Sequence, residues 1–274
     1  MKNLFNIIKE SIYSPKFYSK ISEKSFKSAF GYFFLLILLL TLIRVIFLID
    51  PLGNKAPQQF RKGIESLINC YPKDLEITIT QGQATTSAKQ PYFVSCDQTK
   101  QASQSAILVI ETQTPYSKDQ FDKYKAPAWL NKDSLIVKST EVEIKTYDLA
   151  KVKNFKLNKN VIDSTYNSAS KYFVYIGPIL LLLSFVMIYL GYVFNLVYLL
   201  VLSLFLLLLS NITKKEFTFP QIYKIGLYAI TLPVFIELIL DLLRSWTHFG
   251  GVPFMFSLII LGVIFVNLNK EKSS

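Results

Sequence analysis

The chain has 274 residues, of which 51% are hydrophobic, and it is therefore too apolar for an average soluble protein. Its 30 lysines and arginines nevertheless show that large parts of it lie in water. The formal net charge of +11 does not indicate a nucleic-acid partner, because the sequence shows no basic groove with interleaved aromatic residues. We expect a membrane protein that binds no nucleic acid.

The first 28 residues predict the side of the membrane on which the chain starts. They contain six lysines and two glutamates, and cytoplasmic flanks of membrane spans are enriched in Lys and Arg. The apolar run that follows, 29–49, is broken only by Arg44. It lacks the small-residue cleavage pattern that would favour the alternative, a cleaved signal peptide. The sequence therefore predicts a first transmembrane helix with the N-terminus inside.

The basic segment also contains a candidate amphipathic helix. In a helix over residues 2–13, Leu4, Phe5, Ile8 and Ile12 would gather on one side. Such a helix can lie along the inner membrane face. It can equally be a short solvated helix packed on the rest of the protein, and both interpretations stay open.

Residues 50–171 form a polar block that is long enough to be a small domain with its own core. Alternating or β-branched stretches predict short strands, and helical spacing over 60–69 predicts a helix. Cys70 and Cys96 both fall in this block, so the compartment permits a disulfide between them. The alternative is two reduced, unrelated thiols. The strands are expected at 75–80, 106–111, 134–137 and 142–147, with a turn at 81–83.

An uncharged run extends over residues 172–210. As a single helix it would be about 58 Å long, nearly twice the thickness of the hydrocarbon core of roughly 30 Å. Gly191 and Asn195 lie close to its midpoint, and they predict a tight turn between two antiparallel spans. Two later apolar segments, 222–243 and 252–268, complete five spans.

The positions of five lysines do not fully agree with a chain of five spans. Starting inside, five crossings put the last basic loop and the tail outside, although short basic loops prefer the cytoplasm. Four crossings would put all of these lysines inside, so five spans are the prediction and four the alternative. The lysines concerned are Lys214, Lys215, Lys224, Lys270 and Lys272.

The predicted fold class is a membrane α-helical bundle of about five transmembrane helices with an inserted small mixed, strand-rich extracytoplasmic domain. The predicted segments, in chain order, are a basic, partly amphipathic cytoplasmic segment 1–28, span 29–49, extracytoplasmic domain 50–171, spans 172–192, 194–212, 222–243 and 252–268, and a polar tail 269–274.

The sharpest candidate site is a set of charged residues in the predicted spans. Glu237, Asp241 and Arg244 are spaced by four and three residues and share one helical face. With Arg44 they could serve as a proton or ion relay or contact a ligand, because ionisable groups at membrane depth tend to be functional. The alternative is local pairing near a span end, with the side chains reaching the interface. Four spans would allow Arg44 to pair with Glu237 and Asp241, whereas five would put them at opposite faces.

The sequence contains no recognised catalytic motif. The sole histidine, His248, has no His or Cys partner at metal-ligand spacing. There is no Gly-x-Ser-x-Gly elbow, Gly-rich phosphate loop or His-Glu-x-x-His pair. We therefore expect no enzymatic activity, no cofactor and no metal.

Six passages are distinctive when taken together, namely 11–16 (SIYSPK), 71–72 (YP), 79–83 (ITQGQ), 90–92 (QPY), 107–112 (ILVIET) and 223–233 (YKIGLYAITLP). In this order they resemble a known bacterial membrane-protein family of unknown function, some of whose members are labelled maltodextrin-utilisation proteins. Glu111 stands where Asp is more usual in the family. The passage 223–233 is also similar to the wider group of Yip-like five-span proteins. The resemblance implies a polytopic envelope protein with one external domain and supplies no activity.

The first functional hypothesis is a non-enzymatic protein of the bacterial cytoplasmic membrane. Its external domain would sense or bind something, or would assist a transport or envelope complex. Its expected partners are the lipid bilayer and other membrane or transport proteins. The alternative is a small transporter or channel in which Arg44, Glu237 and Asp241 line a polar path. A membrane-bound enzyme is a third class, and it would need polar side chains of the outer domain to converge on one pocket.

Overall fold

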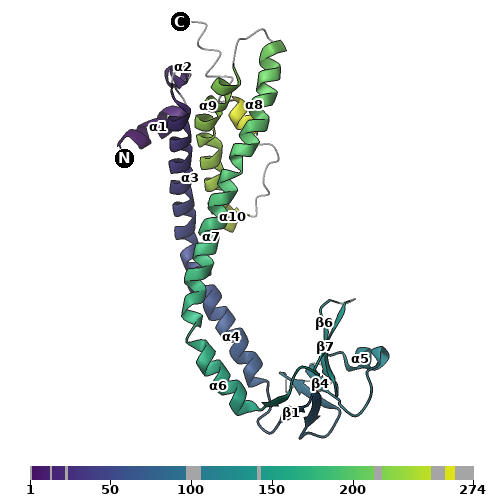
Figure 1. The fold of residues 1–274 in the computed structure, drawn as a ribbon. Coiled ribbons are helices and arrows are strands. Elements are labelled where there is room, and N and C mark those ends of the chain that lie inside the picture. Colours follow the sequence, from purple (N-terminus) through teal and green to yellow (C-terminus); the bar gives the residue numbers. More distant parts are fainter. Residues whose placement is uncertain are drawn as a thin grey trace. The chain divides into compact units, whose positions relative to one another are not determined.

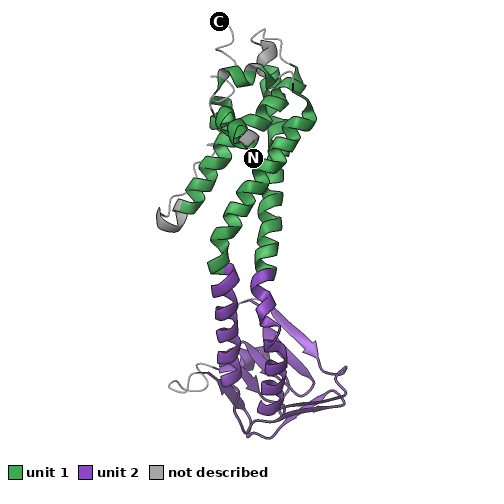
Figure 2. Ribbon diagram, turned by 90° about the vertical axis from the view of Figure 1, so that its left-hand side faces the viewer, with its two compact units in different colours: residues 1–51, 179–274 green, residues 52–178 purple. Residues whose placement is uncertain are grey.

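The computed structural model of the chain describes residues 2–12, 14–21, 24–96, 106–140, 143–212, 218–247 and 257–262. The chain divides into two compact units (Figure 2). The first comprises Met1–Pro51 and Ile179–Ser274, and the second is Leu52–Pro178. All described strands lie in the second unit. A helical part and a separate part with mixed sheets are thus confirmed.

The first unit is a bundle of helices (Figure 1). Local signals mark two of their starts. The hydroxyl of Ser14 accepts a hydrogen bond from the backbone of Phe17 and caps a helix whose first residue is proline, and Ser25 caps the next helix in the same way. The helices are α1 (Lys2–Ile12), α2 (Pro15–Ser19), α3 (Phe26–Leu48), α7 (Ile176–Val193), α8 (Asn195–Ile212), α9 (Phe219–Ala229) and α10 (Thr231–Thr247), and residues 257–262 are also helical.

The long uncharged run differs from its prediction, because it does not fold back on itself. The amide of Phe194 donates to the carbonyl of Leu190, and that of Tyr198 donates to Phe194, as in an uninterrupted helix. α7 and α8 therefore continue one another (Figure 1). A tight turn at Gly191 would require an unusual backbone, and among the described residues Gly82 is the only glycine with positive φ. Because no proline and no residue with a strained backbone lies near Gly191, the leucine-rich sequence stays helical there.

Three of the described helices are long and apolar enough to cross a membrane, namely Phe26–Asn69, Phe173–Leu208 and Phe219–Leu242. The third joins α9 and α10, since Ile230 donates to Gly226 and Val234 donates to Ile230 through the backbone. Five spans are not confirmed. Of the predicted span 252–268, only 257–262 is described, and Lys214, Lys215, Lys270 and Lys272 lie outside the described residues.

α9 is the central helix of this bundle. It packs between α3 and α8 (Figure 1), and all its residues from Ile222 to Ala229 are buried. The contact with α8 is close, because a Cβ atom at Gly226 would lie 3.2 Å from Leu199. On α3, the side chains of Phe33, Leu36 and Leu40 are fully buried. The core of the unit is thus almost wholly apolar.

The second unit combines two sheets with three further helices. One sheet is antiparallel with the strand order β2-β1-β8, and the other has the order β3-β4-β5-β6-β7, in which β4 and β5 are parallel and the remaining pairs antiparallel. Its elements, with the two short helices that border it, are η2 (Ile49–Lys55), α4 (Ala56–Asn69), β1 (Ile77–Thr80), β2 (Gln83–Thr86), β3 (Tyr92–Ser95), β4 (Ala106–Ile110), α5 (Lys118–Tyr124), β5 (Ala128–Leu130), β6 (Ser134–Lys138), β7 (Ile144–Asp148), β8 (Asn154–Leu157), α6 (Lys159–Ser170) and η3 (Phe173–Tyr175).

Trp129 is the largest side chain buried in the second unit. The rings of Tyr116, Phe121 and Tyr124 pack against it with centroids 5.3 to 5.9 Å away. Its indole N–H donates to the carbonyl of Glu111 at 3.0 Å, so the buried polar atom is satisfied. This cluster lies beside the crossover from β4 to β5, the only parallel pair among the described strands.

The turn between β1 and β2 requires glycine. Gly82 has φ of 79°, and a Cβ atom there would lie 2.7 Å from the Cα of Ala150. We expect Gly82→Ala to lower the free energy of unfolding of the second unit by about 1 to 3 kcal/mol, because it adds backbone strain and a steric clash. The measurement is urea unfolding of a fragment of residues 56–171, followed by the fluorescence of Trp129.

Gly63 provides a matched control for this substitution. It lies in α4, and no atom lies within 4 Å of a Cβ atom built there. Gly63→Ala should leave the stability unchanged or raise it, since alanine favours a helix. Equal stability of Gly82→Ala and the unaltered fragment would contradict the turn described here.

Candidate functional site

Arg44 of α3 forms the centre of a charged cluster in the helical unit. Its Nη2 atom donates to Oδ2 of Asp241 and lies 3.5 Å from Oε1 of Glu237. The two carboxylates are one turn apart on α10 and face the same way. The guanidinium also lies over the ring of Tyr192 from α7, 5.1 Å from its centroid. Three helices therefore meet at this arginine.

The cluster joins one arginine to two carboxylates, and some of its polar atoms are not satisfied by the described residues. Among the described residues, Nε of Arg44 and the hydroxyl of Tyr192 are buried without a hydrogen-bond partner. About a third of the Asp241 side chain is exposed, so the cluster opens to one side. A buried polar atom is costly unless it finds a hydrogen-bond partner such as water.

A second polar cluster lies near the start of α3 and contains no charge. The hydroxyl of Tyr32 is 2.7 Å from that of Thr231 and 3.1 Å from that of Ser11. Ser11 in turn donates to Thr231 at 3.1 Å, and Tyr18 donates to the carbonyl of Ser11 at 2.5 Å. All four side chains are buried. This hydroxyl cluster attaches α1 and α2 to the bundle by satisfied hydrogen bonds.

The two clusters together give the direction of the helices. Tyr32 precedes Arg44 on α3, and their partners Thr231 and Asp241 follow in the same order on α10. The separations of 12 and 10 residues correspond to about 18 and 15 Å of helix. α3 and α10 therefore run parallel.

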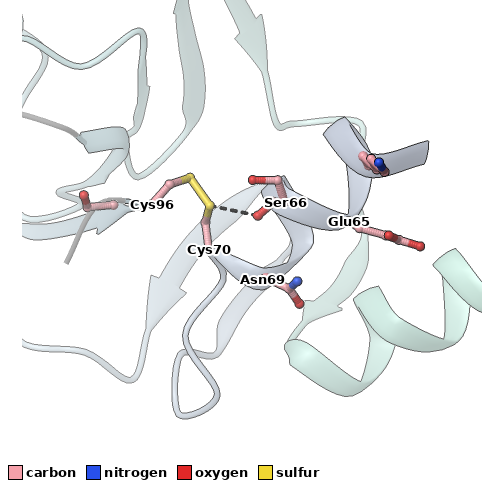
Figure 3. A pocket seen from close by; sticks show the side chains of 7 residues that line it. Glu65, Ser66, Asn69, Cys70 and Cys96 are labelled. Atoms are coloured by element: carbon pink, nitrogen blue, oxygen red, sulfur yellow. Dashed lines mark hydrogen bonds between the residues drawn. A yellow bond between two sulfur atoms is a disulfide. The ribbon is translucent and has the colours of Figure 1, made fainter. Parts of the chain in front are cut away.

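The second unit has a polar pocket beside a disulfide (Figure 3). Cys70, at the end of α4, is bonded to Cys96, which follows β3. The pocket has a volume of about 430 Å³. Its acidic group is Glu65, which points away from the disulfide in Figure 3 and accepts hydrogen bonds from Tyr166 at 2.6 Å and Arg61 at 3.1 Å. The lining residues are Lys62, Glu65, Ser66, Asn69, Cys70, Ser95 and Cys96.

Other candidates from the sequence are less informative. Arg244 lies in α10, but its side chain is outside the described part, and so is His248. Within the described residues, no group of three His, Cys, Asp or Glu residues could hold a metal ion.

Residues 5–269 match the model of a family described as a protein of unknown function, DUF1189. The chain belongs to this family. No curated protein and no solved structure matches it. The DUF1189 assignment covers both the helical unit and the strand-rich unit, so they are parts of one family architecture.

In this DUF1189 chain, sequence reasoning missed Tyr192 and the hydroxyl cluster. Tyr192 is one of many aromatic residues near helix ends and carries no distinguishing signal. Ser11 and Thr231, however, lie in two of the passages that resemble a known family, 11–16 and 223–233. The structure brings these distant passages into direct contact.

We expect the ion pair to stabilise the bundle of this DUF1189 protein. Arg44→Gln should lower the free energy of unfolding by about 1 to 3 kcal/mol, between the values for exposed and buried pairs, because two carboxylates lose their counter-charge. Asp241→Asn should cost less in the Arg44→Gln background than alone. A double-mutant cycle measured by unfolding in detergent micelles tests this coupling.

Arg61→Gln is the control, since Arg61 pairs with Glu65 at the surface of the second unit. It should leave the unfolding of the helical unit unchanged. Strictly additive effects of the Arg44 and Asp241 substitutions would rule out the coupling.

Proposed function

We propose that this chain is a non-enzymatic protein of the bacterial cytoplasmic membrane that crosses the bilayer four times and holds the strand-rich unit outside. The surface of the long helix supports a membrane location. Leu182, Met187 and Leu208 have between 63% and 70% of their area exposed. A continuous apolar surface of this kind is unfavourable in water and favourable among lipid tails.

The observation that supports four crossings is the ion pair between Arg44 on α3 and Asp241 on α10, because these two helices run parallel. Two parallel helices of one chain must be separated by a return through the membrane, and α7–α8 supplies that return. If α3 leaves the cytoplasm, α10 ends outside, and a span over 252–268 brings the C-terminus back inside. Lys214, Lys215, Lys270 and Lys272 then all lie inside, in agreement with the positive-inside rule.

We propose that the external unit senses or binds a ligand, or assists a transport or envelope complex. Its disulfide suits an extracytoplasmic compartment. The pocket beside it offers Lys62, Ser66 and Asn69, which suit a polar ligand. The resemblance to proteins labelled for maltodextrin utilisation makes an oligosaccharide the first ligand class to test. The absence of a catalytic sequence motif supports binding over catalysis.

Cysteine accessibility in intact cells tests the topology. We expect an impermeant maleimide to label a cysteine at exposed Gln59 and to leave cysteines at Lys215 and Lys272 unlabelled. The native disulfide is kept, because a bonded cysteine does not react with the reagent. The unaltered chain should be labelled only after reduction, which also tests the bond between Cys70 and Cys96.

The controls separate topology from failed labelling. All three chains with an added cysteine should react after the cells are permeabilised. Labelling of all three in intact cells would mean an odd number of crossings and would overturn the four-span proposal. Labelling at positions 215 and 272 but not at position 59 would show that the chain has the opposite orientation in the membrane.

A small transporter or channel is the second candidate, and the charged Arg44 cluster favours it. Ionisable groups within a helical bundle, partly exposed and beside two buried atoms that no described residue satisfies, would suit a proton or small cation that passes through the bundle.

We expect the cluster to be required if the protein carries ions. The combined substitutions Arg44→Gln, Glu237→Gln and Asp241→Asn should abolish proton or potassium flux into liposomes that contain the protein. The triple variant must unfold as a single species in detergent for the test to count. Equal flux with the unaltered and the triple-variant protein would remove this candidate, and Arg61→Gln serves as a neutral control.

A further inference from the structure

The bundle covers only part of the apolar surface of α1. Ile8 and Ser11 face the bundle and are buried, with 8% and 0% of their area exposed. Phe5 is 68% exposed and Ile12 is 36% exposed. At 100° per residue, Phe5 and Ile12 lie about 20° apart around the helix, and their mean direction lies about 80° from that of Ile8 and Ser11. These two exposed residues form a second apolar side of α1, the Phe5/Ile12 flank.

Polar residues of α1 follow directly beyond this flank. Asn6, Lys9 and Glu10 are all exposed. Lys9 lies about 40° from Phe5 around the helix, on the side away from the bundle, and Asn6 and Glu10 lie about 100° and 140° from Phe5. The order around α1 is thus bundle contact, apolar flank, lysine and polar face. This order is typical of a helix that lies in a membrane interface, where a lysine beside the apolar side chains reaches the headgroups.

The contacts of α1 show at which level of the bundle it is attached. The hydroxyl of Ser11 lies 3.1 Å from that of Tyr32 and donates to that of Thr231 at 3.1 Å. Tyr32 lies six residues, or about 9 Å of helix, after the first residue of α3 and inside the apolar run 29–49. Thr231 lies within the apolar helix Phe219–Leu242. α1 crosses the direction of α3 (Figure 1), so it lies beside the apolar parts of both helices and not beyond their ends.

We infer that α1 is an interfacial helix whose Phe5/Ile12 flank inserts among the lipid acyl chains of the leaflet in which α3 begins. A lipid surface is the occupant that fits, because the bundle already exposes apolar side chains at this level. Phe34 and Leu35, next to the level of Tyr32 on α3, are 38% and 53% exposed. Interfacial helices bury their apolar side about 5 to 10 Å into this boundary, in agreement with the attachment near Tyr32. The inference rests on the proposed membrane location of the helical unit.

The test is site-directed spin labelling of the full chain in vesicles of phosphatidylethanolamine and phosphatidylglycerol. A nitroxide is attached to one added cysteine, in Phe5→Cys, Asn6→Cys or Ile12→Cys, and the native disulfide is kept. Collisions of the nitroxide with dissolved oxygen report the acyl chains, and collisions with a water-soluble nickel chelate report water. We expect the oxygen-to-nickel collision ratio at positions 5 and 12 to exceed that at position 6 by roughly threefold or more, because only the flank lies within the acyl boundary.

Asn6→Cys is the matched control, because position 6 is exposed and adjacent to Phe5 but points about 100° away from it. A fourth label, in Met187→Cys on α7, tests the membrane location itself, since Met187 is 70% exposed. A high ratio at position 187 with equally low ratios at positions 5, 6 and 12 would overturn the inference and leave the membrane location standing.

Low ratios at all four positions would overturn both proposals. Rare collisions with both reagents at positions 5 and 12 would show that protein, and not lipid, covers the flank, and this result would also overturn the inference. If Phe5→Cys fails to fold, Ile12→Cys provides an independent measurement on the same flank.

Discussion

The ion pair between Arg44 and the carboxylates of α10 is the interaction on which the arrangement of the helical unit depends. A guanidinium among apolar helices is costly unless a carboxylate meets it, so α3 and α10 can pack only where Asp241 and Glu237 face Arg44. The ring of Tyr192 closes the third side. Together with the contact of Tyr32 with Thr231, this ion pair determines the relative direction of the two helices and, in the proposed membrane setting, the side on which the chain ends.

The hydroxyl cluster and the ion pair together set the register of the bundle. Between them, α3 presents fully buried apolar side chains such as Phe33, Leu36 and Leu40. Apolar surfaces alone tolerate a slide of one helical turn, about 5.4 Å, with modest loss. Such a slide would separate Tyr32 from Thr231 and Arg44 from Asp241 at the same time. The apolar core supplies contact area, and the two polar clusters make one register more favourable than its neighbours.

The features that follow from the local pattern of apolar and polar residues could be predicted from the sequence. Those that depend on contacts between residues far apart in the sequence were missed. The apolar helices and the strands around 77–80, 106–110 and 134–138 follow from periodicity. β2 and β8 are short and polar and were not predicted as strands, although the turn expected at 81–83 lies between β1 and β2. The pairing of β8 with β1 has no sequence signature, because β8 lies far along the chain. The turn was predicted from the length of the run and from Gly191 and Asn195, but a single glycine costs a helix only about 1 kcal/mol and does not end it. The sequence predicted the contact of Arg44 with Asp241 only for a chain with four spans. Whether the number of spans is even or odd depends on the whole chain and not on the residues around Arg44.

The continuous helix then poses a problem of length. Its 36 residues, Phe173–Leu208, extend for about 54 Å, whereas a bilayer with its headgroups measures about 40 to 45 Å. A tilt of roughly 35° reconciles the two and lies within the range of spanning helices. The 23 residues of α3 need no such tilt. The long helix would then touch α3 near Arg44 and diverge from it along α8. This divergence provides the space that α9 fills between α3 and α8.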